Sequence, residues 1–68
     1  MKVKNIMDYF GPRLNCSAKL HYLGQTGFVF ETDGFDRPEE DEILEAYVID
    51  ISIGNDDGIP YLDLTLEA

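Results

Sequence analysis

Cysteine, histidine and tryptophan are almost absent from this chain, which has one Cys, one His and no Trp. A single cysteine cannot form an internal disulfide and fits the reducing cytoplasm, where we expect the protein to reside. Cys16 and His21 are too few for a structural zinc site. They are also five positions apart on one predicted strand, so they point to opposite faces and cannot form a nucleophile–base pair. We therefore expect no enzyme activity, no metal and no other cofactor.

Long apolar runs are missing too. No stretch approaches the roughly 20 residues of a membrane-spanning helix, and the N-terminus lacks the apolar region of a signal peptide. Glycine-rich phosphate-binding motifs and EF-hand loops are also absent from the sequence.

Basic residues are scarce. Five lysines and arginines stand against fourteen acids, for a formal net charge of −9. This charge opposes direct binding to nucleic acid or to an anionic membrane, and it favours a basic protein as the partner. The apolar fraction of 44%, with four Phe and four Tyr, is that of a globular chain. We expect residues 1–68 to form one small domain.

The stretch from Ala46 to Leu66 predicts a β-hairpin, because apolar and other residues alternate on both sides of Asp57-Gly58, a preferred pair for a type I′ turn. Closure at that turn places three apolar pairs on one buried face: Ile53 with Leu62, Ile51 with Leu64, and Ile49 with Leu66. A turn at Asp56-Asp57 would instead set Asp50 against Asp63, which like-charge repulsion disfavours.

Residues 2–10 predict a helix whose apolar side is formed by Val3, Ile6, Met7 and Phe10, with Gly11-Pro12 as its stop.

Alternation from Leu14 to Tyr22, continued by Phe28 and Phe30, predicts a second hairpin. Its loop must have three or five residues if the even-numbered side chains are to share a face. Cys16 falls on that inward face as a small core residue.

Residues 31–45 hold eight of the acids against Arg37 alone, a net charge of −7. Asp36 and Glu39 have the spacing of a capping box, and Pro38 is tolerated in a first helical turn. The pattern predicts either a short helix near residues 38–45, anchored by Ile43 and Leu44, or an ordered loop. The candidate protein-binding residues are the six acids between residues 36 and 45: Asp36, Glu39, Glu40, Asp41, Glu42 and Glu45.

These elements together predict an α+β fold, with the N-terminal helix packed on a mostly antiparallel four-stranded sheet made of two hairpins. The short acidic helix or loop lies between the hairpins. The second sheet face, which carries Lys19, His21, Asp50, Ser52, Asp63 and Thr65, is expected to be polar and wet.

This layout, with the helix sequence KNIMDYF and the ending GIPYLDLTLEA, resembles small acidic proteins carried by bacterial phages and mobile elements. That class includes anti-CRISPR proteins, some of which occupy basic nucleic-acid channels of host defence complexes. The resemblance implies a non-enzymatic inhibitor that mimics nucleic acid at a basic host protein site. Such mimicry needs residues 39–45 to be helical, because only then does their charge spacing, about one per 2 Å, approach that of duplex DNA. The alternatives are an accessory subunit of a larger enzyme and a structural homodimer.

Overall fold

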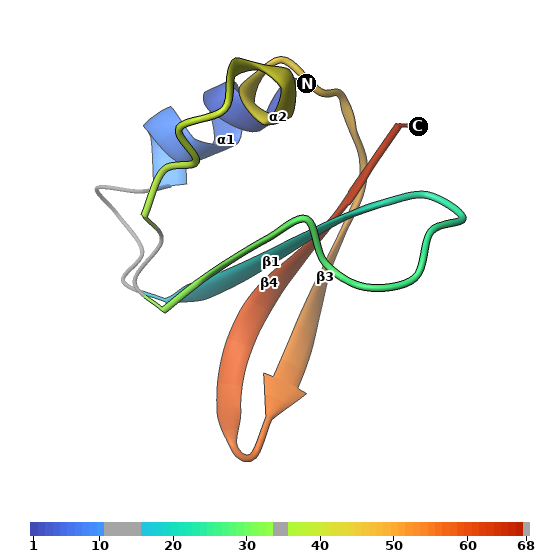
Figure 1. The fold of residues 1–68 in the computed structure, drawn as a ribbon. Coiled ribbons are helices and arrows are strands. Elements are labelled where there is room, and N and C mark those ends of the chain that lie inside the picture. Colours follow the sequence, from blue (N-terminus) through green and yellow to red (C-terminus); the bar gives the residue numbers. More distant parts are fainter. Residues whose placement is uncertain (11–15, 34–35, 68) are drawn as a thin grey trace.

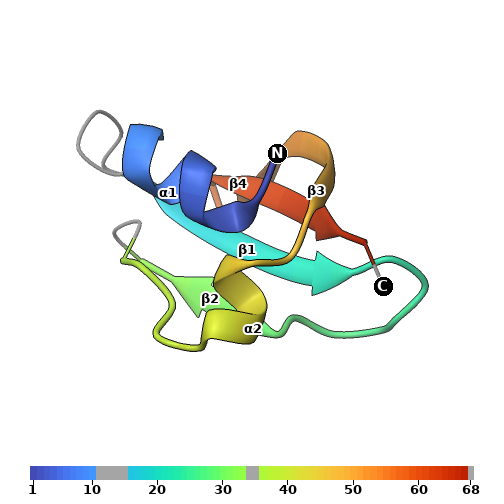
Figure 2. The same cartoon turned by 90° about the horizontal axis from the view of Figure 1, so that it is seen from above.

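The computed structural model describes residues 1–10, 16–33 and 36–67. Two helices lie on one side of a four-stranded sheet (Figures 1 and 2). The elements in chain order are α1 (Val3–Phe10), β1 (Ser17–Tyr22), β2 (Phe30–Thr32), α2 (Asp41–Leu44), β3 (Val48–Asp56) and β4 (Ile59–Leu66). The predicted α+β class is confirmed. Neither helix of this described part is long and apolar enough to cross a membrane.

Helix α1 packs as its apolar spacing predicts. Val3, Ile6 and Met7 are buried, and Phe10 is half-buried against the same core. The predicted stop at Gly11-Pro12 and the predicted strand residue Leu14 lie outside the described residues.

The β3–β4 hairpin forms largely as predicted. Asp57 and Gly58 have φ values of 51° and 86°, the left-handed pair that a type I′ turn requires. Ile53 pairs with Leu62 and Ile51 with Leu64. The register then shifts between Val48 and Asp50, so that Val48, and not Ile49, pairs with Leu66. The predicted Ile49–Leu66 pair is wrong because this β-bulge adds one residue to β3.

The sheet is mixed, which corrects the expectation of a mostly antiparallel arrangement. Its strand order is β2-β1-β4-β3, and the central strands β1 and β4 run parallel. Both predicted antiparallel pairs are present, and Leu20 pairs with Phe30 as the parity predicts. The first loop is longer than three or five residues, since residues 23–29 separate β1 from β2. Phe28 lies in that loop and is exposed, so it does not continue the buried face.

The helices cover only the middle of the sheet. Leu20, Leu64 and Leu66 are fully buried there, together with the apolar side chains of α1. Cys16 is half-buried against this core, as predicted. The edge strand β3 lies beyond the cover: Ile51 is 46% exposed and Ile53 is 71% exposed. The prediction that the β3 isoleucines share the buried face is therefore wrong as to burial, although Ile51 and Ile53 pair with the predicted leucines.

Candidate protein-binding surface

The acidic segment, residues 36–45, contains a shorter helix than predicted. Helix α2 covers only Asp41–Leu44, and the residue at its N-cap is Glu40, whose side chain makes no capping hydrogen bond. The predicted capping box at Asp36 and Glu39 is wrong. Asp36 lies outside the helix, and its backbone N–H donates to Thr32 Oγ1 at 2.8 Å. Thr32 thus connects the segment to the end of β2.

Buried side chains hold this segment against the molecule. Ile43 is buried, as predicted, and Leu44 is half-buried against the core. Pro38 is also fully buried, which its expected place in a first helical turn does not predict. Arg37 forms an ion pair with Asp8 of α1. The acids between these anchors consequently point outward.

Glu45, one of the predicted binding residues, is engaged within the molecule. Its two carboxylate oxygens each accept a hydrogen bond of 2.7 Å, one from Lys2 Nζ and one from Lys4 Nζ. The hydrogen bonds from Lys2 and Lys4 lower the pKa of Glu45 from 4.5 to about 2. The hydrogen bond to Glu45 likewise raises the pKa of Lys2. Glu45 joins the end of α2 to the start of α1, so we remove it from the binding set.

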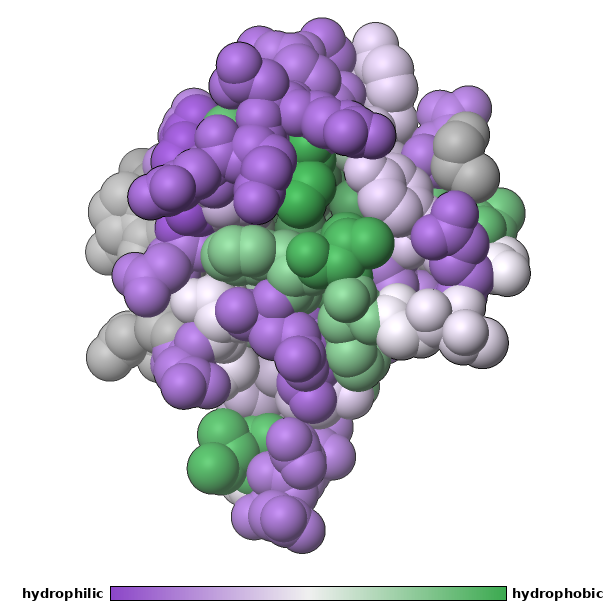
Figure 3. Space-filling model, in the orientation of Figure 1, coloured by the Kyte–Doolittle hydropathy of each residue, from purple (hydrophilic) through white to green (hydrophobic). Residues whose placement is uncertain are grey.

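The other five predicted residues stay exposed, and none of them forms an ion pair with any described residue. We call this set the acidic surface: Asp36, Glu39, Glu40, Asp41 and Glu42. Every described lysine and arginine is engaged elsewhere, with Lys2 and Lys4 on Glu45, Lys19 on Glu31 and Asp56, and Arg37 on Asp8. Figure 3 shows hydrophilic side chains gathered over the end of the molecule where α2 lies.

A groove runs beside the acidic surface. It is lined by β2, the residue after it and the start of the acidic segment, and its acids are Glu31, Asp33, Asp36, Glu39 and Glu40. Arg37 is the one basic side chain among its described lining residues. Glu31 and Asp33 were not among the predicted site residues, although they belong to the same acid-rich stretch of sequence. The structure adds them because they line the same groove as Glu39 and Glu40.

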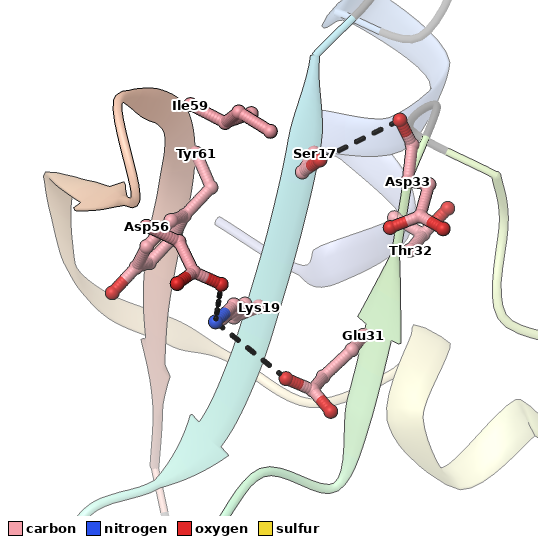
Figure 4. Close-up of a pocket in the computed structure, with 8 residues that line it drawn as sticks. All are labelled: Ser17, Lys19, Glu31, Thr32, Asp33, Asp56, Ile59 and Tyr61. Carbon is pink, nitrogen blue, oxygen red and sulfur yellow. Dashed lines mark hydrogen bonds and ion pairs between the residues drawn. The ribbon is translucent and has the colours of Figure 1, made fainter.

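The polar face of the sheet is organised around Lys19 (Figure 4). Its Nζ lies 3.4 Å from an Asp56 carboxylate oxygen and 3.7 Å from one of Glu31. The same ammonium sits 4.4 Å from the Tyr61 ring centroid and 5.2 Å from that of Phe28. Burial works to lower the pKa of Lys19, but the hydrogen bond and charge of Asp56, with smaller effects of Tyr61 and Glu31, raise it overall. Lys19 therefore stays protonated and ties β1 to both edges of the sheet.

His21 lies on the same face, between Asp63 and Thr65. Its Nε2 is 3.0 Å from Thr65 Oγ1 and 3.1 Å from Asp63 Oδ1. The Asp63 oxygen is buried and receives no well-aligned hydrogen bond. Its contact with His21 is an ion pair only when the imidazole ring is protonated. A catalytic triad needs the acid and the nucleophile on opposite ring nitrogens. Both neighbours here approach the same nitrogen, so the cluster lacks that geometry.

No group of three or more potential metal-ligating side chains occurs within residues 1–10, 16–33 and 36–67. Comparison of the chain with protein-family models, with curated proteins and with solved structures finds no match.

Proposed function

We propose that this protein is a non-catalytic module that binds a basic site of a partner protein through its acidic surface. One observation carries the proposal: five exposed carboxylates lie on an anchored segment, while every described basic side chain is already paired elsewhere. Unpaired like charges repel each other in the free protein, and a basic partner relieves that repulsion.

The acidic groove extends this surface and suits a basic side chain. A lysine or arginine of the partner that enters it would meet the carboxylates of Asp33, Glu39 and Glu40, while Glu31 already lies 3.7 Å from Lys19 Nζ. Charged side chains arranged in this way accelerate encounter and select the partner by its charge, more than they increase raw affinity.

Imitation of duplex nucleic acid is the narrower form of this proposal, and the helix length argues against it. Duplex-like spacing required a helix across residues 39–45, but α2 covers only Asp41–Leu44. With residues 36–40 at the extended limit, residues 36–45 span about 25 Å with a net charge of −5, or about one charge per 5 Å, against about one per 1.7 Å in DNA. A basic patch on a protein does not require the tighter spacing.

Two classes of partner fit such a surface. The resemblance to small phage and mobile-element proteins favours an inhibitor that covers a basic site of a host protein. An accessory subunit that completes a larger enzyme is the second candidate. Of the described groups that could act in catalysis, Lys19 has a raised pKa, opposite to what a lysine base needs, so we assign no chemical step to this chain.

The test is affinity capture of the partner from the native host, followed by measurement of its binding at low and high salt. Replacing Glu39, Glu40 and Glu42 together with Gln should weaken binding severalfold at low salt. Wild-type affinity for the partner should fall as the ionic strength rises past about 0.15 M, where the screening length is about 8 Å. Loss of the partner's nucleic-acid binding would identify an inhibitor, and a gain in its catalytic activity would identify an accessory subunit.

A matched control separates the place of the charges from their number. Asp50, Asp57 and Glu67 are exposed acids away from the segment, and their replacement by Asn, Asn and Gln removes the same charge. This control should bind nearly as well as wild type. Equal losses in the two triple variants would mean that only the total charge matters, and unchanged binding in both would refute the proposal.

A further inference from the structure

The outer edge of β3 is long and open. The other edge strand, β2, has three residues, whereas β3 has nine. Short edge strands are one way in which proteins avoid pairing with other chains, and lysine or proline on the edge is another. Strand β3 contains neither lysine nor proline. Figures 1 and 2 show it as the outermost strand, on the side of the sheet away from β2.

The N-terminus covers only the beginning of this edge. Val48 N–H donates to the Met1 carbonyl at 2.7 Å, and Val3 N–H donates to the Ala46 carbonyl at 3.0 Å. The β-bulge follows directly, between Val48 and Asp50. The distortion that a bulge introduces is therefore confined to the covered end and leaves the rest of the edge free to pair.

The turn determines which backbone groups face outward. Asp56 and Ile59 flank a two-residue turn and form a hydrogen-bonded pair, so the N–H and C=O groups of Ser52 and Gly54 also point to β4. Those of Ile51, Ile53 and Asn55 point away from it. Within the described residues, no backbone hydrogen bond from a turn, loop or cap reaches these outward groups.

The side chains on this edge are also uncovered. Ile51 and Ile53 face the same way as buried Leu64 and Leu62, yet both are exposed. A shallow apolar hollow adjoins Ile53, with Cys16 and Pro60 among its other lining residues. Open backbone groups and uncovered apolar side chains thus coincide on one stretch of β3.

We propose that β3 pairs antiparallel with β3 of a second copy of this chain, about a two-fold axis at Ser52. In this register Ile51 of each copy lies opposite Ile53 of the other, in hydrogen-bonded pairs, and the four isoleucines cover one another. Ser52 lies opposite Ser52, and Asp50 lies opposite Gly54. The two four-stranded sheets join into one continuous sheet.

The residue order of β3 favours a second copy over another partner. A two-fold interface must be self-complementary, so that when one residue contacts another the reverse contact also occurs. In the segment from Ile51 to Ile53 one isoleucine stands on each side of Ser52, so the apolar side chains of one copy meet those of the other. Moving the axis to Ile53 would set Asp50 directly against Asp56, which like-charge repulsion disfavours.

The net charge of −9 per copy weakens this dimer without preventing it. The acidic surface follows β2, at the opposite edge of the sheet from β3, so most of the unpaired charge lies far from the axis. A standard interface buries about 800 Å² per partner, close to a fifth of the 4428 Å² surface of this molecule. One paired strand buries less, so we expect a weak dimer that salt strengthens.

The first measurement is the molecular mass in solution by sedimentation equilibrium, from about 10 μM to about 1 mM, a range that brackets weak dissociation constants. We expect a monomer at the low end and a dimer at the high end, with the midpoint moving to lower concentration as salt increases. Ile53→Lys should remain monomeric throughout, and because the side chain is exposed its fold should be intact by circular dichroism. A monomeric wild type at every concentration would overturn the proposal.

The second measurement tests the register. In a Cys16→Ala background, Ser52→Cys places two thiols opposite each other in a non-hydrogen-bonded pair, where Cα atoms are about 4.5 Å apart, close enough for a disulfide. It should form a disulfide-linked dimer at least tenfold faster than Asn55→Cys, an edge control that lies opposite Ile49. Equal rates would overturn the two-fold axis at Ser52.

This dimer is independent of the proposed function. The Glu39, Glu40 and Glu42 variant should dimerise at least as well as wild type, because its substitutions lie at the far edge and reduce repulsion. A complex with a basic strand at the β3 edge would instead weaken as salt increases. Such an opposite salt dependence, with a monomeric free protein, would assign the edge to a different partner and refute self-association.

Discussion

Single charged side chains connect parts of this molecule that are distant in sequence. Glu45 reaches back to Lys2 and Lys4, and Lys19 joins Glu31 of β2 to Asp56 of the β3–β4 hairpin. In a small acidic chain with five bases, the positions of those bases decide which acids are structural and which remain available.

Glu45 gives a pH-dependent prediction. Its pKa is about 2 in the folded protein, below the ordinary value of 4.5, so folding favours the ionised form. The resulting stabilisation is fully present above about pH 4.5 and is lost as the pH falls toward about 2. Glu45→Gln should therefore unfold at lower urea concentration than wild type near neutral pH, and the difference should shrink progressively below about pH 4.5.

Glu42→Gln is the matched control, since Glu42 is exposed and forms no ion pair with a described residue. It should not reduce stability at neutral pH. A Glu45→Gln deficit that stayed constant from neutral to acid pH would contradict the ion-pair explanation and would indicate lost packing instead.

At the scale of whole elements, the position of a strand in the sheet decides how much its apolar side chains contribute. Leu64 on central β4 is fully buried, while its partner Ile51 on the edge strand β3 is 46% exposed. Leu64→Ala should cost about 2–5 kcal/mol through lost burial and the cavity left behind. Ile51→Ala should cost only about 1 kcal/mol in the monomer, because roughly half of its side chain already contacts water.

Urea titration of both variants at low protein concentration checks this difference. Low concentration matters because a β3 dimer would bury Ile51. Equal costs for the two variants would mean that β3 is covered in solution even in the monomer, contrary to the exposure seen here.

The sequence predicted the local elements well because local chemistry specifies them. The apolar spacing of α1 and the turn at Asp57-Gly58 depend on residues within a few positions of each other. The order of the strands does not, and the parallel pairing of β1 with β4 carries no local signal. The exposure of Ile51 follows from that order, since α1 has eight residues and covers only the central strands. Alternation predicted which side chains share a face, but not whether anything lies over it.

The candidate site shows the same division. Exposure of the acids was predictable from their density in the sequence. The engagement of Glu45 by Lys2 and Lys4, and the addition of Glu31 and Asp33, depend on contacts between distant segments. The bulge at Ile49 likewise became visible only in the structure.

At the scale of the whole molecule, unpaired negative charge opposes folding over distances that salt controls. The molecule measures 29 × 26 × 18 Å. At about 10 mM ionic strength the screening length is about 30 Å, so every charge acts on every other, whereas at 0.15 M it is about 8 Å and only neighbours interact. The surface ion pairs weaken with salt as well, but solvent-exposed ion pairs contribute little to stability.

Repulsion should therefore dominate, and the free energy of unfolding of the wild type should rise between these two ionic strengths, measured with urea, which adds no ions. At about 10 mM both triple variants, at residues 39, 40 and 42 and at residues 50, 57 and 67, should be more stable than wild type by similar amounts, since distant and clustered charges then count alike. At about 0.15 M only the variant in the acidic segment should keep its advantage, because only its charges lie within a screening length of several others. Wild-type stability that falls with salt would show that the ion pairs of Glu45, Lys19 and Arg37 outweigh the repulsion, and the acidic surface would then impose no strain for a partner to relieve.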